Sequence, residues 1–263
     1  MRLAVIIPCL NEEATISEVI SAIPDSIQGI ADVEVIVIDD GSTDKTPQLA
    51  EGAGAKVVSH TVNKGVGAAF QTGIDAALKR NVDIIVNMDG DGQFNPSDIP
   101  TLIQPILAGE ADFVTCTRFG RSEWMPTMPG IKLWGNRMMC RIINFLISDG
   151  PFTDVSCGFR AYSRETALKL NLHGDFTYTQ ESFIDLAGKQ TRMVEVPLKV
   201  RGVREHGSSR VASNLWKYAA RSSLIILRAA RDVKPLQMFG TLAVLLFLMG
   251  LLLGGGVFFW WVF

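Results

Sequence analysis

Two aspartates one residue apart, Asp89 and Asp91, are the side chains in this sequence best suited to hold a hard divalent cation. They follow the apolar run DIIVNM (83–88), which has the composition of a buried strand. Mg²⁺ commonly takes one or two protein carboxylates together with the phosphates of a substrate. Gln93 lies two residues further on and offers an amide oxygen on the same side. The pattern predicts a metal site for a phosphate-bearing ligand, although such pairs also occur in ordinary loops.

A second acidic segment begins with Asp39, the last residue of the strand-like run VEVIVID (33–39), and continues through Asp40 to Asp44. A carboxylate that emerges from a buried strand can accept hydrogen bonds from a ribose or a base. The same residues also form turns, and Ser42 or Asp44 could cap the next helix. Both interpretations can hold together, with Asp39 serving a ligand and Asp44 serving the cap.

Other segments have residue types that contact phosphates. The glycine-rich segment 63–69 matches neither a dinucleotide-binding fingerprint nor a Walker loop, so helix packing and ligand contact both remain open for it. Arg204 and Arg210 flank a turn of small residues and could clamp a diphosphate, although a solvated basic loop has the same composition. Arg118 and Arg160 follow apolar segments and could face the same crevice. The three histidines show no metal-ligand spacing.

The elements that must position these residues alternate between strands and helices. We expect strands at 3–8, 33–39, 56–59, 83–88, 112–117 and 192–202, and helices at 16–23, 65–80, 96–109, 132–147 and 214–232. This alternation indicates an α/β domain with a mostly parallel sheet, in which ligands bind beyond the carboxyl ends of the strands. Because Glu12, Asp39 and Asp89 follow three different strands, we expect one polar site assembled from their loops.

Composition narrows the class of protein further. The chain has 263 residues, of which 48% are hydrophobic and 20% charged, which excludes bulk disorder. Its four cysteines form no C-x-x-C pair, so we expect reduced, buried thiols rather than a zinc ribbon or a disulfide framework. Residues 1–120 carry 17 acidic and 7 basic side chains, whereas residues 121–263 carry 10 and 18. An acidic front half suits a metal site, and a basic back half suits a phosphate-bearing partner or an anionic surface.

The carboxyl-terminal end of the chain predicts a membrane anchor. The last 29 residues, after Lys234, carry no charge and are long enough to span a bilayer. The helix expected at 214–232 places a basic stripe opposite an apolar stripe, as in helices that lie on anionic membranes. Residues 199–234 hold 9 basic and 2 acidic side chains, so we expect the α/β domain to face the cytoplasm. We expect no signal peptide, and we expect that the natural chain continues beyond the span.

Six segments in order, VIIPCLNEE, VIDDGSTD, NKGVGAA, MDGDGQFNP, TDVSCGFRAYSRE and REHGSSR, resemble those of the family 2 glycosyltransferases, which have the GT-A fold. The resemblance covers about residues 3–234 and is greatest to the dolichol-phosphate mannose synthase and polyprenyl-phosphate glycosyltransferase group. It implies a GT-A domain over residues 1–211, followed by an amphipathic juxtamembrane helix (212–234) and a transmembrane helix (235–263). It also implies Mg²⁺ or Mn²⁺ as cofactor.

The resemblance implies a role for each matching position. Nucleotide-sugar binding would fall to Pro8, Leu10, Glu12, Val37, Asp39, Asp89, Gly90, Asp91, Arg118, Arg204 and Arg210. The metal would be held by Asp91, Gln93 and Asp89, and the acceptor phosphate by Arg160, Asp154 and Ser209. The residues expected to take part in catalysis are Asp89, Asp91, Arg118 and Glu181. Leu10 and Arg210 stand where the group usually has an aromatic residue and a lysine.

The implied reaction is the inverting transfer of a monosaccharide from a nucleotide-sugar, with mannose from GDP-mannose as first expectation, to a polyprenyl phosphate in the bilayer. UDP-glucose or UDP-N-acetylglucosamine are the alternative donors. An ionised phosphate needs no general base, whereas a hydroxyl acceptor on a glycan or glycolipid would need one, with Glu181 or Asp154 as candidates. A membrane-tethered module that binds sugar nucleotides without turnover is the non-enzymatic alternative. No nucleic-acid partner is expected, and a homo-oligomer is compatible with the sequence.

Overall fold

The computed structural model describes residues 1–126, 128, 130–147, 150–172, 178–201, 227, 231 and 235–262. Its centre is a seven-stranded sheet with the order β3-β2-β1-β4-β6-β5-β7. The sheet is parallel except for β6, which runs antiparallel to both of its neighbours. The strands are β1 (Arg2–Cys9), β2 (Asp32–Asp39), β3 (Lys56–Ser59), β4 (Ile84–Asn87), β5 (Phe113–Thr117), β6 (Arg160–Ser163) and β7 (Met193–Pro197). The predicted α/β domain with a mostly parallel sheet is confirmed.

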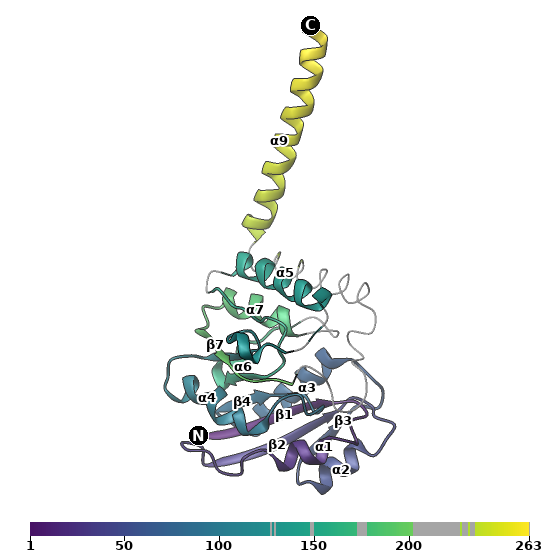
Figure 1. Cartoon of the computed structure of the whole chain (residues 1–263), viewed down its shortest axis with the longest axis vertical. Helices are drawn as coiled ribbons and strands as arrows, with labels where there is room; N and C mark the ends of the chain where they lie inside the picture. The colour runs from purple at the N-terminus through teal and green to yellow at the C-terminus, as the bar shows by residue number, and fades with distance from the viewer. Residues whose placement is uncertain are drawn as a thin grey trace.

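Helices cover both faces of this sheet (Figure 1). They are α1 (Ile16–Ser21), α2 (Thr46–Gly52), α3 (Val66–Lys79), α4 (Ile99–Leu107), α5 (Gly130–Leu146), α6 (Arg164–Lys169) and α7 (Thr179–Gly188), with α9 (Pro235–Val262) beyond the domain. Single 3-10 turns lie at Pro96–Asp98 and Ser122–Trp124. The helix expected at 214–232 falls outside the described residues, apart from positions 227 and 231.

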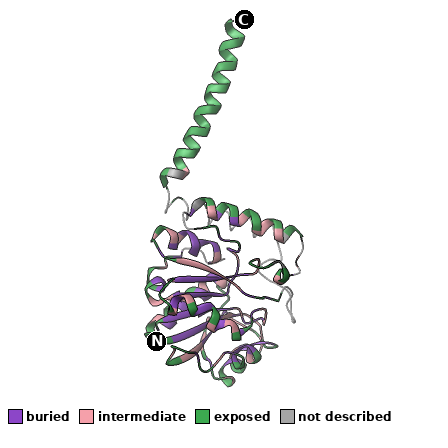
Figure 2. Ribbon diagram, turned by 60° about the vertical axis from the view of Figure 1, so that its left-hand side comes forward, coloured by how far each residue is buried: buried purple, intermediate pink, exposed green. Residues whose placement is uncertain are grey.

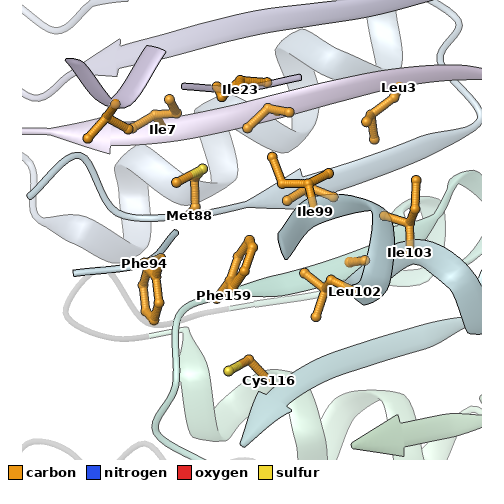
Figure 3. Packing of buried hydrophobic residues seen from close by; sticks show 14 of the residues in the cluster. Leu3, Ile7, Ile23, Met88, Phe94, Ile99, Leu102, Ile103, Cys116 and Phe159 are labelled. Carbon is orange, nitrogen blue, oxygen red and sulfur yellow. The ribbon is translucent and has the colours of Figure 1, made fainter. Parts of the chain in front are cut away.

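Alternate residues of β1 divide the core into two clusters because successive strand side chains point to opposite faces. Leu3, Val5 and Ile7 pack with α1 and α4 in one cluster, part of which Figure 3 shows. Ala4 and Ile6 pack on the other face with residues of α3, α5 and α7. Burial on both faces explains why β1 reads as a continuous apolar run rather than an alternating one.

One strand was not predicted from the sequence. β6 has only four residues and begins with Arg160, and it lies between β4 and β5, which would otherwise be neighbours. A short segment with a charged first residue lacks the apolar pattern that marked the other strands. Its burial comes from the two flanking strands, which are distant in sequence, and the expected strand at 192–202 is shorter, ending at Pro197.

The helix α9 extends away from the α/β domain (Figure 1). Its segment Met238–Val262 is 25 residues long and apolar enough to cross a membrane, and none of its most apolar window is buried against the rest of the chain. Figure 2 shows α9 exposed beyond its first turn, and α5 lying across the end of the domain that faces it. The structure thus contains one candidate transmembrane helix among the residues it describes.

Candidate active site

The buried thiol of Cys9, the last residue of β1, lies within electrostatic reach of four carboxylates at or after the ends of β1, β2 and β4. Burial raises the pKa of Cys9 well above its ordinary value, and the charges of Glu12, Asp89, Asp39 and Asp91 raise it further. Because charge–charge interactions weaken with distance, these carboxylates must share one small region. The expectation that the acidic loops after β1, β2 and β4 form one site therefore agrees with the geometry.

The loop after β4 is held in one conformation by close contacts. A Cβ atom at Gly90 would lie 2.6 Å from the sulfur of Cys9, so only glycine fits between Asp89 and Asp91. The hydroxyl of Thr15 donates a 2.7 Å hydrogen bond to the carbonyl oxygen of Gly90. These contacts tie the loop to β1 and to the start of α1, and they fix the backbone between the two aspartates.

Asp91 and Gln93 are linked to the segment that follows β7. Asp91 is 2% exposed, and its Oδ1 accepts a 3.0 Å hydrogen bond from the backbone N–H of Gln93. The side-chain Nε2 of Gln93 donates to the carbonyl oxygen of Arg201, and the N–H of Arg201 donates back to the carbonyl oxygen of Gln93. The chain therefore enters residues 202–210 beside Gln93. Arg204, Ser209 and Arg210 themselves lie outside the described residues.

The loops after β1 and β2 are bonded to each other. Asn11, at a positive φ of 52°, accepts a hydrogen bond from the N–H of Thr43 at 2.7 Å, and its own N–H donates to Ser42 Oγ at 2.9 Å. The N–H of Glu12 donates to Thr46 Oγ1 at 2.8 Å. Asp39 Oδ1 accepts a 2.8 Å hydrogen bond from the N–H of Ser42, three residues further on. These hydrogen bonds join residues 11–12 and 42–46 into one polar surface, which we call the rim of the nucleotide site.

The predicted nucleotide-site residues of β1 and β2 differ in exposure. Pro8 and Leu10 are half-buried, at the end of β1 and directly after it. Val37 is 0% exposed and packs inside one core cluster, so its side chain is not on the surface of a crevice. The sequence alone could not separate these positions, because Val37 stands in an unbroken apolar run.

Asp40, the residue after Asp39, is held by hydrogen bonds to the segment that leads into α3. Asp40 accepts hydrogen bonds from the N–H groups of Lys64 and Gly65, each at 2.9 Å, and lies 2.8 Å from Nδ1 of His60. Gly65 has a φ of 96°, which favours glycine, and α3 begins directly after it. These bonds give the beginning of the glycine-rich segment 63–69 a role in the fold, because they fix the backbone that leads into α3.

Arg118 follows β5 and forms a two-point ion pair with Asp154. Its Nε lies 2.6 Å from Oδ2, and its Nη2 lies 3.0 Å from Oδ1. Burial alone would lower the pKa of Arg118, but the charge of Asp154 and its hydrogen bonds raise it above the ordinary value. Glu195 of β7 accepts hydrogen bonds from the N–H groups of Thr153 and Asp154, which holds this segment against the sheet.

Two of the three residues expected at the acceptor phosphate are fully buried. Arg160 is 0% exposed, and its guanidinium donates to Ser182 Oγ and to three backbone carbonyls, beneath the ring of Phe183. Asp154 is also 0% exposed and is paired with Arg118. Arg160 is therefore enclosed in the core, and the Asp154 carboxylate contacts the guanidinium of Arg118.

Glu181 lies in the first turn of α7 and is 3% exposed. Tyr178 immediately precedes that helix, and burial raises its pKa well above the ordinary value, with a further contribution from the charge of Asp89. Sequence analysis missed Tyr178. Its ring stacks on Phe70, 4.0 Å between centroids, which fixes it between α3 and the loop after β4.

Asn87 and Gly158 complete the surroundings of Asp89. The side-chain Nδ2 of Asn87 lies 2.7 Å from both the Tyr178 hydroxyl and the carbonyl oxygen of Gly158. A Cβ atom at Gly158 would lie 3.2 Å from Oδ1 of Asp89 and 3.1 Å from the Tyr178 hydroxyl. The signal for Asn87 was available in the sequence, since it is the polar residue in an otherwise apolar strand.

The donor set fits a hard divalent cation. Asp89 and Asp91 present carboxylates, and Gln93 presents an amide oxygen that its bond to Arg201 does not use. Within the described residues no three His, Cys, Asp or Glu side chains lie close enough to hold a metal by themselves. A site with few protein ligands matches Mg²⁺ or Mn²⁺ completed by the phosphates of a substrate rather than a closed structural metal centre.

Comparison with known proteins places this site in a family. Residues 4–170 match the family described as Glycosyl transferase family 2. A UDP-N-acetylglucosamine--dolichyl-phosphate N-acetylglucosaminyltransferase from Methanococcus voltae is 34% identical over 182 residues, which cover 63% of this chain and 70% of that protein. The polyprenol monophosphomannose synthase of Mycolicibacterium smegmatis is 28% identical over 232 residues, which cover 83% and 86%.

Among solved structures, the glucosyl-3-phosphoglycerate synthase from Mycobacterium tuberculosis, in complex with Mn²⁺, UDP and phosphoglyceric acid, superposes with a TM-score of 0.66 at 28% identity. The superposition covers 87% of this chain and 78% of that one. The likeness confirms the expected GT-A architecture. Since the family match spans more than half of the sequence, the chain belongs to glycosyl transferase family 2.

Proposed function

We propose that this chain is a membrane-bound, metal-dependent glycosyltransferase that moves one monosaccharide from a nucleotide-sugar to a polyprenyl phosphate. One observation carries the proposal: the chain that holds the carboxylate cluster of a family 2 glycosyltransferase also has a long apolar helix whose most apolar stretch is not buried against the rest of the chain. Such a helix would keep the domain at the surface where a lipid acceptor resides. The names of the Methanococcus and Mycolicibacterium relatives support the same acceptor class.

The donor would bind at the carboxyl ends of β1, β2 and β4. Glu12 and Asp39 offer carboxylates to the ribose or base, and Pro8 and Leu10 form the half-buried surface beside them. Arg204 and Arg210 would bind the diphosphate. The bonds between Gln93 and Arg201 support this for Arg204, because a three-residue step spans at most about 11 Å.

Asp89, Asp91 and Gln93 would hold Mg²⁺ or Mn²⁺. When bound there, the metal would neutralise charge that develops on the departing diphosphate. The chain's own contribution is to fix the two carboxylates through Gly90 and to place the Arg118 guanidinium next to the end of β5. Arg118 keeps its charge at every working pH, since Asp154 favours the protonated form.

The acceptor oxygen of a polyprenyl phosphate is ionised near neutral pH, because the second pKa of a phosphate monoester is about 6. It can attack the sugar without a general base, from the face opposite the departing diphosphate, and thereby invert the anomeric centre. Glu181 would then support the site rather than accept a proton. The exposed edge of Arg118 and Ser209 would meet the acceptor phosphate.

Mannose from GDP-mannose remains the preferred donor, in line with the Mycolicibacterium synthase. UDP-N-acetylglucosamine and UDP-glucose are the alternatives, supported by the Methanococcus enzyme and by the UDP bound in the structural neighbour. The basic residues before α9 support a catalytic domain on the cytoplasmic side of the membrane. A hydroxyl acceptor is the second candidate function, because the structural neighbour was crystallised with phosphoglyceric acid rather than a lipid.

The test is sugar transfer into an organic-extractable lipid. Membranes containing the full chain are given a polyprenyl phosphate and, separately, labelled GDP-mannose, UDP-glucose and UDP-N-acetylglucosamine, each with and without EDTA. We expect a lipid product from one donor that disappears with the chelator. Donor binding without any lipid product from the three donors would contradict the proposal and favour the hydroxyl acceptor or a binding role.

A further inference from the structure

A buried group of hydrogen bonds lies two residues before Asp89. Asn87, the last residue of β4, is 0% exposed, and its Nδ2 lies 2.7 Å from the carbonyl oxygen of Gly158 and 2.7 Å from the hydroxyl oxygen of Tyr178. Gly158 lies shortly before β6, and Tyr178 directly precedes α7. One side chain thus joins three distant parts of the chain beside a carboxylate of the candidate metal site.

The chemistry of these two bonds fixes the direction of each donor. A backbone carbonyl only accepts hydrogen bonds, so the amide atom of Asn87 that faces Gly158 must be the nitrogen. The same nitrogen carries a second hydrogen, which it donates to the oxygen of Tyr178. The phenol is therefore the acceptor in this bond, and its own proton must point elsewhere.

The charge of Asp89 acts on this phenol. Burial raises the pKa of Tyr178 well above its ordinary value and the charge of Asp89 raises it further, so the hydroxyl keeps its proton near neutral pH. A Cβ atom at Gly158 would lie 3.1 Å from the phenol oxygen and 3.2 and 3.4 Å from the two carboxylate oxygens of Asp89. The three oxygens therefore crowd the same side of Gly158, which has no side chain to separate them.

The ring of Tyr178 is held firmly in this position. It stacks on Phe70 with 4.0 Å between the centroids and 3° between the planes, and the guanidinium of Arg160 lies 5.8 Å from its centroid. Phe70 and Arg160 are both 0% exposed. A side chain that is locked by packing holds its polar group at a fixed place.

The amide of Asn87 is costly for the fold. Its Oδ1 is buried and has no hydrogen-bond partner among the residues that the structure describes. An unpaired buried acceptor lowers stability, and positions that break a folding rule in this way are commonly functional. The rest of β4, residues 84–86, is apolar and buried, so the strand itself needs no polar side chain at its end. What the amide nitrogen holds is the reason for the amide.

We propose that Tyr178 is a positioning residue for the metal site: Asn87 holds the phenol oxygen, so that the O–H group is directed toward the Asp89 carboxylate and sets the direction in which this carboxylate faces the metal. The inference rests on the metal site of the proposed function, and it adds two residues that do not contact the metal themselves. Loss of a group that orients a metal-binding carboxylate weakens metal affinity by roughly 10–100-fold.

The direct test is Mn²⁺ binding to the full chain in detergent, measured by calorimetric titration with UDP and, separately, with GDP, and without an acceptor. Tyr178→Phe removes one hydroxyl from a buried ring. The matched control Tyr162→Phe removes another: Tyr162 lies on β6, is 0% exposed and also packs near Phe70, with 5.8 Å between the centroids.

We expect Tyr178→Phe to weaken Mn²⁺ binding by at least roughly tenfold, and Tyr162→Phe to change it by less than about twofold. Equal Mn²⁺ affinities in the two variants would overturn the proposal, because a hydroxyl that serves only the fold gives that result. Binding is read without turnover. An unmodified chain that binds no Mn²⁺ with either nucleotide would instead contradict the metal site of the proposed function, and the inference with it.

Sugar transfer gives a second measurement. Because Asp89 itself remains in Tyr178→Phe, enough Mn²⁺ should refill the site. We expect the half-saturating Mn²⁺ concentration to rise at least roughly tenfold, while the rate at saturating Mn²⁺ stays within about threefold of the unmodified chain. A lower rate at saturation with an unchanged half-saturating concentration would overturn the proposal, because it would show that the hydroxyl acts on a substrate.

The role of Asn87 is tested by a double-mutant cycle. Asn87→Val introduces a strand-forming residue of similar size that donates no hydrogen bond. We expect it to weaken Mn²⁺ binding in the unmodified chain but to cause no further loss in Tyr178→Phe, because the phenol that Asn87 directs is then absent. Additive losses of affinity would overturn the route from Asn87 through Tyr178 to Asp89.

Discussion

Arg118 and Asp154 form a forked ion pair in which the acid is buried and the base reaches the surface. The two contacts are 2.6 Å and 3.0 Å long, and the exposed fractions of the two side chains are 23% for Arg118 and 0% for Asp154. A bidentate pair restricts both the position and the plane of the guanidinium. The chain thereby supplies a fixed positive charge directly after β5.

This pairing predicts that stability and activity can be separated. Either Arg118→Met or Asp154→Leu alone should lower the free energy of unfolding by about 3–5 kcal/mol, because each leaves one partner of a buried pair uncompensated. The double variant should recover most of that loss and remain inactive in sugar transfer. Denaturant unfolding and the lipid-extraction assay measure the two quantities. Recovery of activity in the double variant would show that Arg118 does not contact a substrate.

The carboxylate cluster predicts a specific metal dependence. Asp91→Asn should weaken Mn²⁺ binding and lower transfer by at least roughly a hundredfold, because a neutral amide is a poorer ligand for a hard cation. Asp75→Asn, an exposed position on α3, is the matched control and should behave as the unmodified chain. Calorimetric titration with Mn²⁺ in the presence of nucleoside diphosphate measures binding directly. Similar affinity in the Asp91 and Asp75 variants would count against this assignment.

Gly158 lies so close to Asp89 that a larger side chain at position 158 should displace the Asp89 carboxylate. In Gly158→Ala the new methyl group would approach Asp89 Oδ1 to 3.2 Å and the Tyr178 hydroxyl to 3.1 Å. We expect a loss of about 1–3 kcal/mol in the free energy of unfolding and a fall in transfer as Asp89 shifts. Adding Tyr178→Phe removes one of the two crowded atoms and should recover part of both losses. Strictly additive effects would exclude the crowding.

The effect of replacing Glu181 on the transfer rate should differ between a phosphate acceptor and a hydroxyl acceptor. With a phosphate acceptor, Glu181→Gln should retain transfer within about tenfold, because an isosteric amide supports the site and no proton has to be removed. With a hydroxyl acceptor, the loss of a general base should cost about 10²–10⁴ in rate. The measurement is the rate with a polyprenyl phosphate and with a glycolipid, for both proteins. A loss above a hundredfold with the phosphate would make Glu181 a base in this reaction as well.

The sequence was sufficient to predict the strands that have an apolar pattern of their own. β1 holds the apolar run 3–9 and β2 the apolar run 35–38, and the acids at the ends of these runs converge because parallel strands end at one edge. It was insufficient where burial depends on partners distant in the chain. Arg160 reads as a surface cation but lies in the core, since Ser182 and backbone carbonyls 3 to 22 positions away solvate it. The pairing of Arg118 with Asp154, 36 positions apart, likewise follows only from the position of β6 between β4 and β5.

Asp44 predicts how the rim of the nucleotide site depends on pH. Burial raises the pKa of its carboxyl, but hydrogen bonds from the side chain and N–H of Thr46 and from the N–H of Glu13 outweigh burial and lower it below the ordinary value. A carboxyl whose pKa falls on folding stabilises the native state above its unfolded pKa, about 3.9, and this contribution is lost as the pH falls through the folded pKa.

Asp44→Ala should therefore lower the free energy of unfolding by about 1 kcal/mol at neutral pH, as expected for losing the acceptor of these hydrogen bonds. The difference from the unmodified chain should shrink progressively below pH of about 4, because both proteins then lack the charge. Donor affinity should fall with it, since the loop that carries Asp44 is bonded to Asn11 and Glu12. Urea unfolding between pH 3 and 7 measures the difference, and a difference that stays constant over this range would show that the Asp44 charge does not hold the rim.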